Sequence, residues 1–144
     1  MKNTLDDLSI TSQDVLNHFL QVHKEELMNF DFEITENLLV NKSNDAFEVK
    51  AQLNGSKVVS TISTKSLSGY RYALNAILNW IKNDANEDLV LSDQPHFTFR
   101  GVIEGFYGKP WSHEQRLRSL DFFGDFGMNA YFIAPKDAPW QRFN

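Results

Sequence analysis

The chain has 144 residues, no cysteine and a formal net charge of −5, with 42% hydrophobic and 23% charged residues. This composition is typical of a soluble globular protein, and the lack of cysteine excludes a disulfide framework and a thiolate metal site. The acidic balance indicates neither a nucleic-acid nor a membrane partner, and no apolar run approaches the ~18 residues of a membrane span. Because residues 1–10 also lack the pattern of a secretion signal, the sequence predicts a cytoplasmic location.

The first predicted element is an amphipathic helix over residues 11–28. Its apolar residues recur at helical spacing, and Thr11 with Asp14 can form a capping box. His18 and His23 lie five residues apart, which does not place them on one helix face, so we interpret both as solvated surface histidines. Alternating apolar and acidic residues over positions 30–34 then predict a strand.

Residues 47–53 predict the clearest strand, because apolar and polar side chains alternate strictly along them. Asn54-Gly55 is a dipeptide preferred in type I′ turns, so residues 57–63 are expected to fold back as the second arm of a hairpin. A second helix is predicted over residues 68–82, followed by a short apolar run at residues 89–91.

The pattern changes at residues 92–95, where Ser-Asp-Gln-Pro separates this apolar run from the next strand. Proline and a change of periodicity are common at domain boundaries. We therefore place a boundary here, which divides the chain into a small α/β domain over residues 1–95 and a second domain over residues 96–144.

The second domain begins with a stretch that combines apolar, aromatic and glycine residues. Alternation predicts a strand over residues 97–103, partly buried on both faces. Gly105 and Gly108 allow positive φ or a close approach of the backbone, and they bracket Phe106 and Tyr107, on which a ligand or the core could stack. Ser112 with Gln115 makes a second capping box, so a helix is expected to follow.

That helix is predicted over residues 113–126, with Gly127 placed to end it in the left-handed conformation. The apolar run at residues 130–134 predicts a second strand, and a strand, helix and strand in this order normally give two parallel strands. Lys136 and Asp137 follow the second strand directly. The carboxyl end of parallel strands is where α/β sheets and (β/α)8 barrels bind their ligands.

Residues 100–111 (RGVIEGFYGKPW) and 128–137 (MNAYFIAPKD) together resemble the opening of the catalytic barrel of family 84 glycoside hydrolases. These are β-N-acetylglucosaminidases, which include O-GlcNAcase and enzymes labelled hyaluronidases. The resemblance implies an α/β protein in which a small α+β domain precedes the first β-α-β unit of a (β/α)8 TIM barrel. Residues 1–95 resemble that small domain, and the related one of family 20 hexosaminidases, by pattern alone.

The resemblance also implies a substrate and a site. The reaction would be retaining hydrolysis in which the 2-acetamido group of terminal N-acetylglucosamine attacks C1, and the substrate would be a glycan or glycoprotein. Gly105 would offer its carbonyl to a sugar hydroxyl and Lys136 would donate to the sugar, with Asp137 and Tyr107 completing the substrate-binding set. No metal or organic cofactor is implied. The family usually has an aspartate after the position of Asp137, where this chain has Ala138.

The barrel is incomplete in this sequence. A (β/α)8 barrel needs ~250 residues, whereas 48 remain from Phe97 to Asn144 (144 − 96). The catalytic pair of the family, two adjacent aspartates at the end of a later strand, is expected beyond Asn144, so no catalytic acid is assigned within the chain. The 144-residue chain alone is predicted to be inactive, and a second polypeptide could complete the barrel.

Each candidate residue also has a structural interpretation. Gly105 could be a turn glycine, the aromatic residues could belong to the core, and Lys136 with Asp137 could form a surface ion pair worth roughly 0–1 kcal/mol. Glu104 could be a general acid, or a structural partner of Arg100 or of the helix N-terminus.

Two other functions therefore remain open from the sequence. One is a non-catalytic remnant whose barrel piece associates with itself or a partner to cover its open strands. The other is a carbohydrate-binding or interaction module that uses aromatic side chains as stacking surfaces: Phe106, Tyr107, Trp111 and Trp140.

Overall fold

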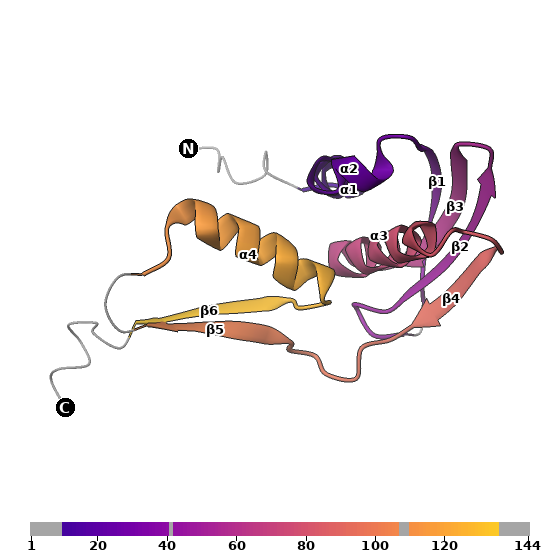
Figure 1. Ribbon diagram of the computed structural model, residues 1–144. Coiled ribbons are helices and arrows are strands. Elements are labelled where there is room, and N and C mark those ends of the chain that lie inside the picture. Colours follow the sequence, from indigo (N-terminus) through magenta and orange to yellow (C-terminus); the bar gives the residue numbers. More distant parts are fainter. Residues whose placement is uncertain (1–9, 41, 107–109, 136–144) are drawn as a thin grey trace, which may run out of the picture. The chain divides into compact units, whose positions relative to one another are not determined.

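A computed structural model describes residues 10–40, 42–106 and 110–135, and the chain divides into two compact units, residues 1–95 and 96–144 (Figure 1). The fold is mixed α/β. Within the described residues, no helix is long and apolar enough to cross a membrane. The first unit contains α1 (Ser12–Val22), α2 (Lys24–Leu27), β1 (Asp31–Leu38), β2 (Phe47–Asn54), β3 (Lys57–Thr64), α3 (Leu67–Lys82) and β4 (Leu89–Asp93).

The first unit is a four-stranded sheet in the order β1-β3-β2-β4, with its helices on one face (Figure 1). β2 is antiparallel to β3 and β4, whereas β1 is parallel to β3. Alternate residues of β2 and β3 point under α3 and α1, as the strict alternation of the sequence predicts. The largest fully buried side chains of this core are Phe19, Val49, Val58, Ile62, Leu74 and Ile77.

The first predicted helix is interrupted. The capping box of Thr11 and Asp14 is confirmed, but α1 ends at Val22 because His23 leaves the helical conformation, with φ −103° and ψ 32°. His18 is exposed as expected, whereas the interpretation of His23 as a solvated residue is wrong. The His23 ring is buried and lies 4.5 Å, centroid to centroid, from that of Phe19, so it is part of the packing under the sheet.

The predicted hairpin is confirmed with a different turn. Asn54 still pairs with Lys57, so the two loop residues are Gly55 and Ser56 rather than Asn54 and Gly55. Gly55 has φ +66° and Ser56 is not among the residues with positive φ. A positive φ at the first loop residue alone is typical of a type II′ turn, which also suits the twist of a hairpin.

The second unit contains β5 (Gly101–Phe106), α4 (His113–Asp125) and β6 (Ala130–Pro135), with β5 and β6 parallel. The capping box of Ser112 and Gln115 is confirmed, and Gly127 has φ +71° after the helix, as the sequence predicts. α4 runs back over one face of the two strands (Figure 1). Register pairs Gly101 with Ala130 at one end and Phe106 with Pro135 at the other, so both strands end at the same level.

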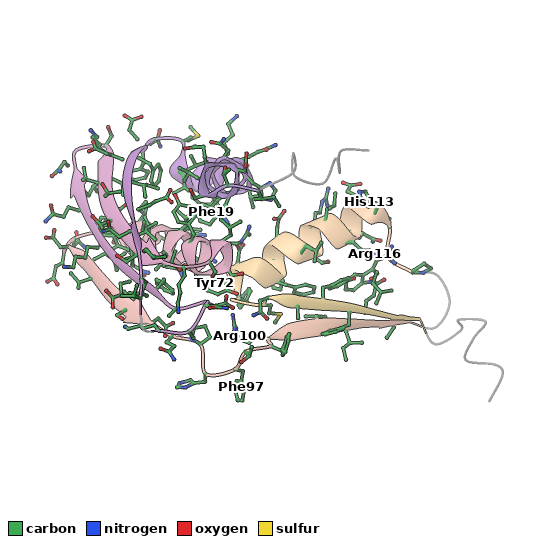
Figure 2. All side chains as sticks on the ribbon, turned by 180° about the vertical axis from the view of Figure 1, so that it is seen from behind. Phe19, Tyr72, Phe97, Arg100, His113 and Arg116 are labelled. Atoms are coloured by element: carbon green, nitrogen blue, oxygen red, sulfur yellow. The ribbon has the colours of Figure 1, made fainter. Side chains whose placement is uncertain are left out.

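The prediction of a strand from Phe97 is wrong by four residues. A strand needs a partner, and β6 begins only at Ala130, opposite Gly101. Before this point the chain is held by hydrogen bonds instead: Arg100 Nε donates to the carbonyl of Gly127 at 2.7 Å, and Arg100 Nη1 donates to that of Phe97 at 2.6 Å. Figure 2 labels Phe97 and Arg100 at this end of β5. The expected burial of Phe97 is therefore not found, and its side chain is exposed.

The second unit has almost no buried interior of its own. Among its described residues the only buried one is Glu104, and α4 contains no buried residue. Apolar side chains remain open to solvent on both the strands and the helix, including Ile103, Phe132, Leu117 and Leu120. Soluble monomers rarely expose a large apolar surface, so these side chains resemble those of a core that further elements would cover.

Gly101→Ala tests how closely β5 and β6 approach. A Cβ at Gly101 would lie 2.2 Å from the carbonyl oxygen of Ala130, a backbone atom that cannot move away cheaply. We expect the substitution to destabilise the second unit by about 1–3 kcal/mol, the usual cost of overpacking. Denaturant unfolding followed by amide signals of this unit measures the change. The matched control is Gly105→Ala, which meets nothing within 4 Å; equal stability of the two variants would contradict the prediction.

Candidate functional site

The carboxyl end of the β5–β6 pair holds the part of the predicted site that the structure describes. Gly105 is the second-last residue of β5 and pairs with Ala134 of β6, two residues before Lys136 in the sequence. It is exposed, and an added Cβ would find open space. Gly105 does not use a positive φ, because it continues β5, and no protein atom lies within 4 Å of an added Cβ. Because Gly105 has no side chain, its backbone is exposed near the end of β5.

The other predicted substrate-binding residues lie outside the described residues. Lys136, Asp137 and Tyr107 are in this group, as is Gly108. Their expected roles stay predictions. The structure does show that β5 and β6 end at the same level, since Phe106 pairs with Pro135.

Glu104 and Gly105 lie on opposite faces of β5, because successive residues of a strand point to opposite sides. Glu104 points toward α4, whose Arg116 it contacts. The face of Gly105 also carries Ile103, which is 67% exposed, and its register partner Phe132, which is 55% exposed. The two faces therefore differ: one holds the buried charge of Glu104 beside the exposed Ile133, and the other carries exposed apolar side chains without a charge.

The Glu104 carboxylate is at the centre of a network that joins all three elements of the unit. Arg116 Nε donates to Oε2 at 2.8 Å and Nη2 donates to Oε1 at 3.0 Å, which makes a two-pronged ion pair. The hydroxyl of Tyr131 donates to Oε2, and the backbone N–H of Trp111 donates to Oε1 at 3.4 Å. Glu104 itself is only 4% exposed. Figure 2 shows Arg116 on the side of α4 that faces the strands.

These contacts decide the charge of Glu104. Hydrogen bonds from Arg116, and then from Tyr131, lower the pKa of the carboxyl from 4.5 to about 2 against the opposing effect of burial. Burial and the bond to this carboxylate raise the pKa of the Tyr131 phenol. A general acid has to carry a proton at the working pH. Glu104 is ionised and points away from the face of Gly105, so it is a structural ion-pair partner rather than an acid.

The sequence named Arg100 or the helix N-terminus as structural partners of Glu104 but missed Arg116 and Tyr131. Arg100 binds carbonyl groups at the opposite end of β5, whereas Glu104 does accept the backbone N–H of Trp111, one residue before the helix cap. Arg116 could have been found, because it precedes Leu120 by four residues and Phe123 by seven and so shares their helix face. Tyr131 gave no such signal, since an aromatic residue in an apolar strand is ordinarily part of a core.

Comparison with known proteins gives a family model that matches this unit, and relatives that match parts of the chain. A family model described as beta-N-acetylglucosaminidase matches residues 100–144. Protein O-GlcNAcase of Rattus norvegicus and that of Mus musculus are each 49% identical to this chain over 37 residues. That alignment covers 26% of this chain and 4% of each relative, so the chain spans only a small part of their length.

Two solved structures resemble larger parts of the chain. The structure of CpGH84B has a TM-score of 0.53 and 32% identity, and the match covers 71% of this chain and 18% of that one. An inactive mutant of the GH20 exo-β-N-acetylglucosaminidase from Vibrio harveyi has a TM-score of 0.61 with 17% identity, over 87% of this chain and 21% of that one. At that identity the second likeness shows the fold alone.

The Glu104 network predicts how the second unit responds to acid. Because the pKa of Glu104 is lowered in the folded state, its contribution to stability is complete above about pH 4.5 and is lost as the pH falls toward 2. We expect Glu104→Gln to remove this part of the pH dependence. Urea unfolding of the second unit at pH 7, 5 and 3 measures it. Glu114→Gln, which affects the exposed pair of Glu114 and Arg118, is the control and should leave the pH dependence unchanged.

Proposed function

Because the chain belongs to family 84 of the glycoside hydrolases, we propose that it forms the amino-terminal part of an enzyme that removes terminal β-linked N-acetylglucosamine from glycans or glycoproteins. In this proposal residues 1–95 are a small domain that precedes the barrel, and residues 96–144 are the first β-α-β unit of the barrel. The observation that carries it is the match of residues 100–144 to a β-N-acetylglucosaminidase family model. The same residues form two parallel strands that end together beside Gly105.

The residues at the strand ends would bind the sugar. The carbonyl of Gly105 would accept a hydrogen bond from a sugar hydroxyl, because the missing side chain leaves the backbone open to a ligand. Lys136 would donate to another hydroxyl as a compact cation. Asp137 would orient Lys136 or bind the sugar directly, and Tyr107 would offer its ring as a stacking surface. Gly105 lies near the end of β5, and the other three residues follow β5 or β6 in the sequence.

The chemical step would use the substrate as its own nucleophile. One carboxylate would polarise the 2-acetamido group so that its carbonyl oxygen attacks C1, while a second carboxylic acid protonates the leaving oxygen. Glu104 is unsuited to either role, since it points under α4 and all its described partners are donors. We expect the two acids on barrel strands that are not in this sequence.

The uncovered face of β5 and β6 supports the inference that further barrel strands cover it, either from the same polypeptide or from a second one. Ile103 and Phe132 are neighbours in the register of this face, and both are mostly exposed. Burying one such side chain is worth roughly 1.5–3 kcal/mol. Covering the face would therefore contribute strongly to the stability of a unit that lacks a core.

A carbohydrate-binding module without activity is the second candidate. It is favoured by the Trp111 side chain, which is 41% exposed close to the carboxyl end of β5. Such a module would bind sugar by stacking, and its binding would depend on Trp111 more than on Gly105.

Hydrolysis of a chromogenic β-N-acetylglucosaminide tests where the catalytic acids are. We expect the purified 144-residue chain to show no turnover above that of a Lys136→Ala control, because both acids would be missing. Turnover that Lys136→Ala reduces would contradict this expectation and would place the acids within the sequence.

Binding of N-acetylglucosamine tests the sugar site itself. An open half-site should bind weakly, so saturation-transfer NMR at high sugar concentration is the suitable measurement. We expect Gly105→Ala to reduce the signal with no loss of fold, because the new methyl group occupies open space beside the carbonyl. Trp111→Phe is the comparison: if it alone reduces the signal, the stacking module is favoured over the proposed site.

A further inference from the structure

We propose that Glu104 is a positioning residue for the sugar site, because it fixes the point at which the connection after Gly105 returns to the fold. This inference rests on the proposed function, because it concerns the sugar site. The contacts of Glu104 that support it are independent of that function. Glu104 immediately precedes Gly105 in β5, and its Oε1 accepts the backbone N–H of Trp111, the residue just before the helix cap Ser112. The side chain of the residue before Gly105 is thus bonded to the backbone just before the helix.

The other oxygen of the carboxylate explains why Glu104 can act as a fixed point. Its Oε2 accepts from Arg116 of α4 and from Tyr131 of β6, so the side chain is tied to the helix and to the neighbouring strand. Arg116 also reaches Oε1, which makes the guanidinium a two-pronged clamp. A planar guanidinium fixes the orientation of a carboxylate in a way that a single donor does not. The carboxylate therefore has one orientation in which all four hydrogen bonds form.

The burial of Glu104 also indicates a positional role. A carboxylate does not stabilise a fold by hydrophobic burial. Burying its charge costs free energy unless it is paired and hydrogen-bonded. An exposed pair of the same residue types is found on α4, where the side chains of Glu114 and Arg118 are mostly exposed. Glu104 of β5 is instead bonded to Arg116 of α4 and to Tyr131 of β6. It therefore holds these three elements together beside Gly105.

The test uses the 144-residue chain labelled with ¹⁵N only in tryptophan, which gives few backbone amide signals. Trp111→Phe assigns the Trp111 signal. In the wild type, we expect this amide proton to lie downfield and to stay constant from pH 7 to below pH 4.5, because the carboxylate that accepts it stays ionised. Glu104→Gln keeps the shape but removes the charge, so the signal should move upfield and its hydrogen exchange should become faster. Glu114→Gln is the matched control and should change neither.

A second variant keeps the proposal testable if Glu104→Gln does not fold. Tyr131→Phe removes one donor and leaves the ion pair in place, so it should shift the Trp111 amide by a smaller amount than Glu104→Gln. An unchanged Trp111 amide in folded Glu104→Gln or Tyr131→Phe overturns the proposal.

Sugar binding by the same samples separates this proposal from the proposed function. Weaker N-acetylglucosamine binding by Glu104→Gln than by Glu114→Gln, together with a shifted Trp111 amide, supports both. If Glu104→Gln shifts the Trp111 amide but the wild-type chain binds no sugar, the result supports the role of Glu104 in fixing Trp111 and counts against a sugar site in this chain. A shifted amide with unchanged sugar affinity overturns the positioning role.

Discussion

The buried carboxylate of Glu104 is the interaction on which the second unit depends. It is the only buried residue among the described part of residues 96–144, and its partners come from α4, β6 and the residue before the helix cap. In most small units an apolar core holds the elements together, and polar groups are placed around it. Here a charge network takes that role, together with the stacked rings of Phe123 and Tyr131, because many other apolar side chains of the unit are exposed.

This arrangement is understandable if the unit is one part of a barrel. In a (β/α)8 barrel the inward side chains of each strand pack against those of other strands, so two strands alone leave that face uncovered. Ile103 and Phe132 lie on such a face, whereas Glu104 lies between strand and helix. The first unit differs, since its four-stranded sheet and three helices bury a complete apolar core that includes Phe19 and Leu74.

The family relation and the geometry limit the chemistry in complementary ways. The family model described as beta-N-acetylglucosaminidase matches residues 100–144, which include β5, α4 and β6. The geometry then removes Glu104 from the list of acids, because its pKa is about 2 and it points away from Gly105. At the described strand ends the geometry leaves the exposed backbone of Gly105.

Sequence alone determined the features that depend on neighbours along the chain. Strict alternation predicted β2, Asn54-Gly55 predicted the hairpin though not its turn, the Ser112 and Gln115 pair predicted the start of α4, and Gly127 predicted its end. It also carried the family motifs. Only tertiary structure decided where β5 begins, since a strand extends as far as its partner, and that His23 is buried, since burial depends on what packs above it. The same reason applies to Glu104: its charge and orientation are set by Arg116 and Tyr131, which lie 12 and 27 residues away in sequence.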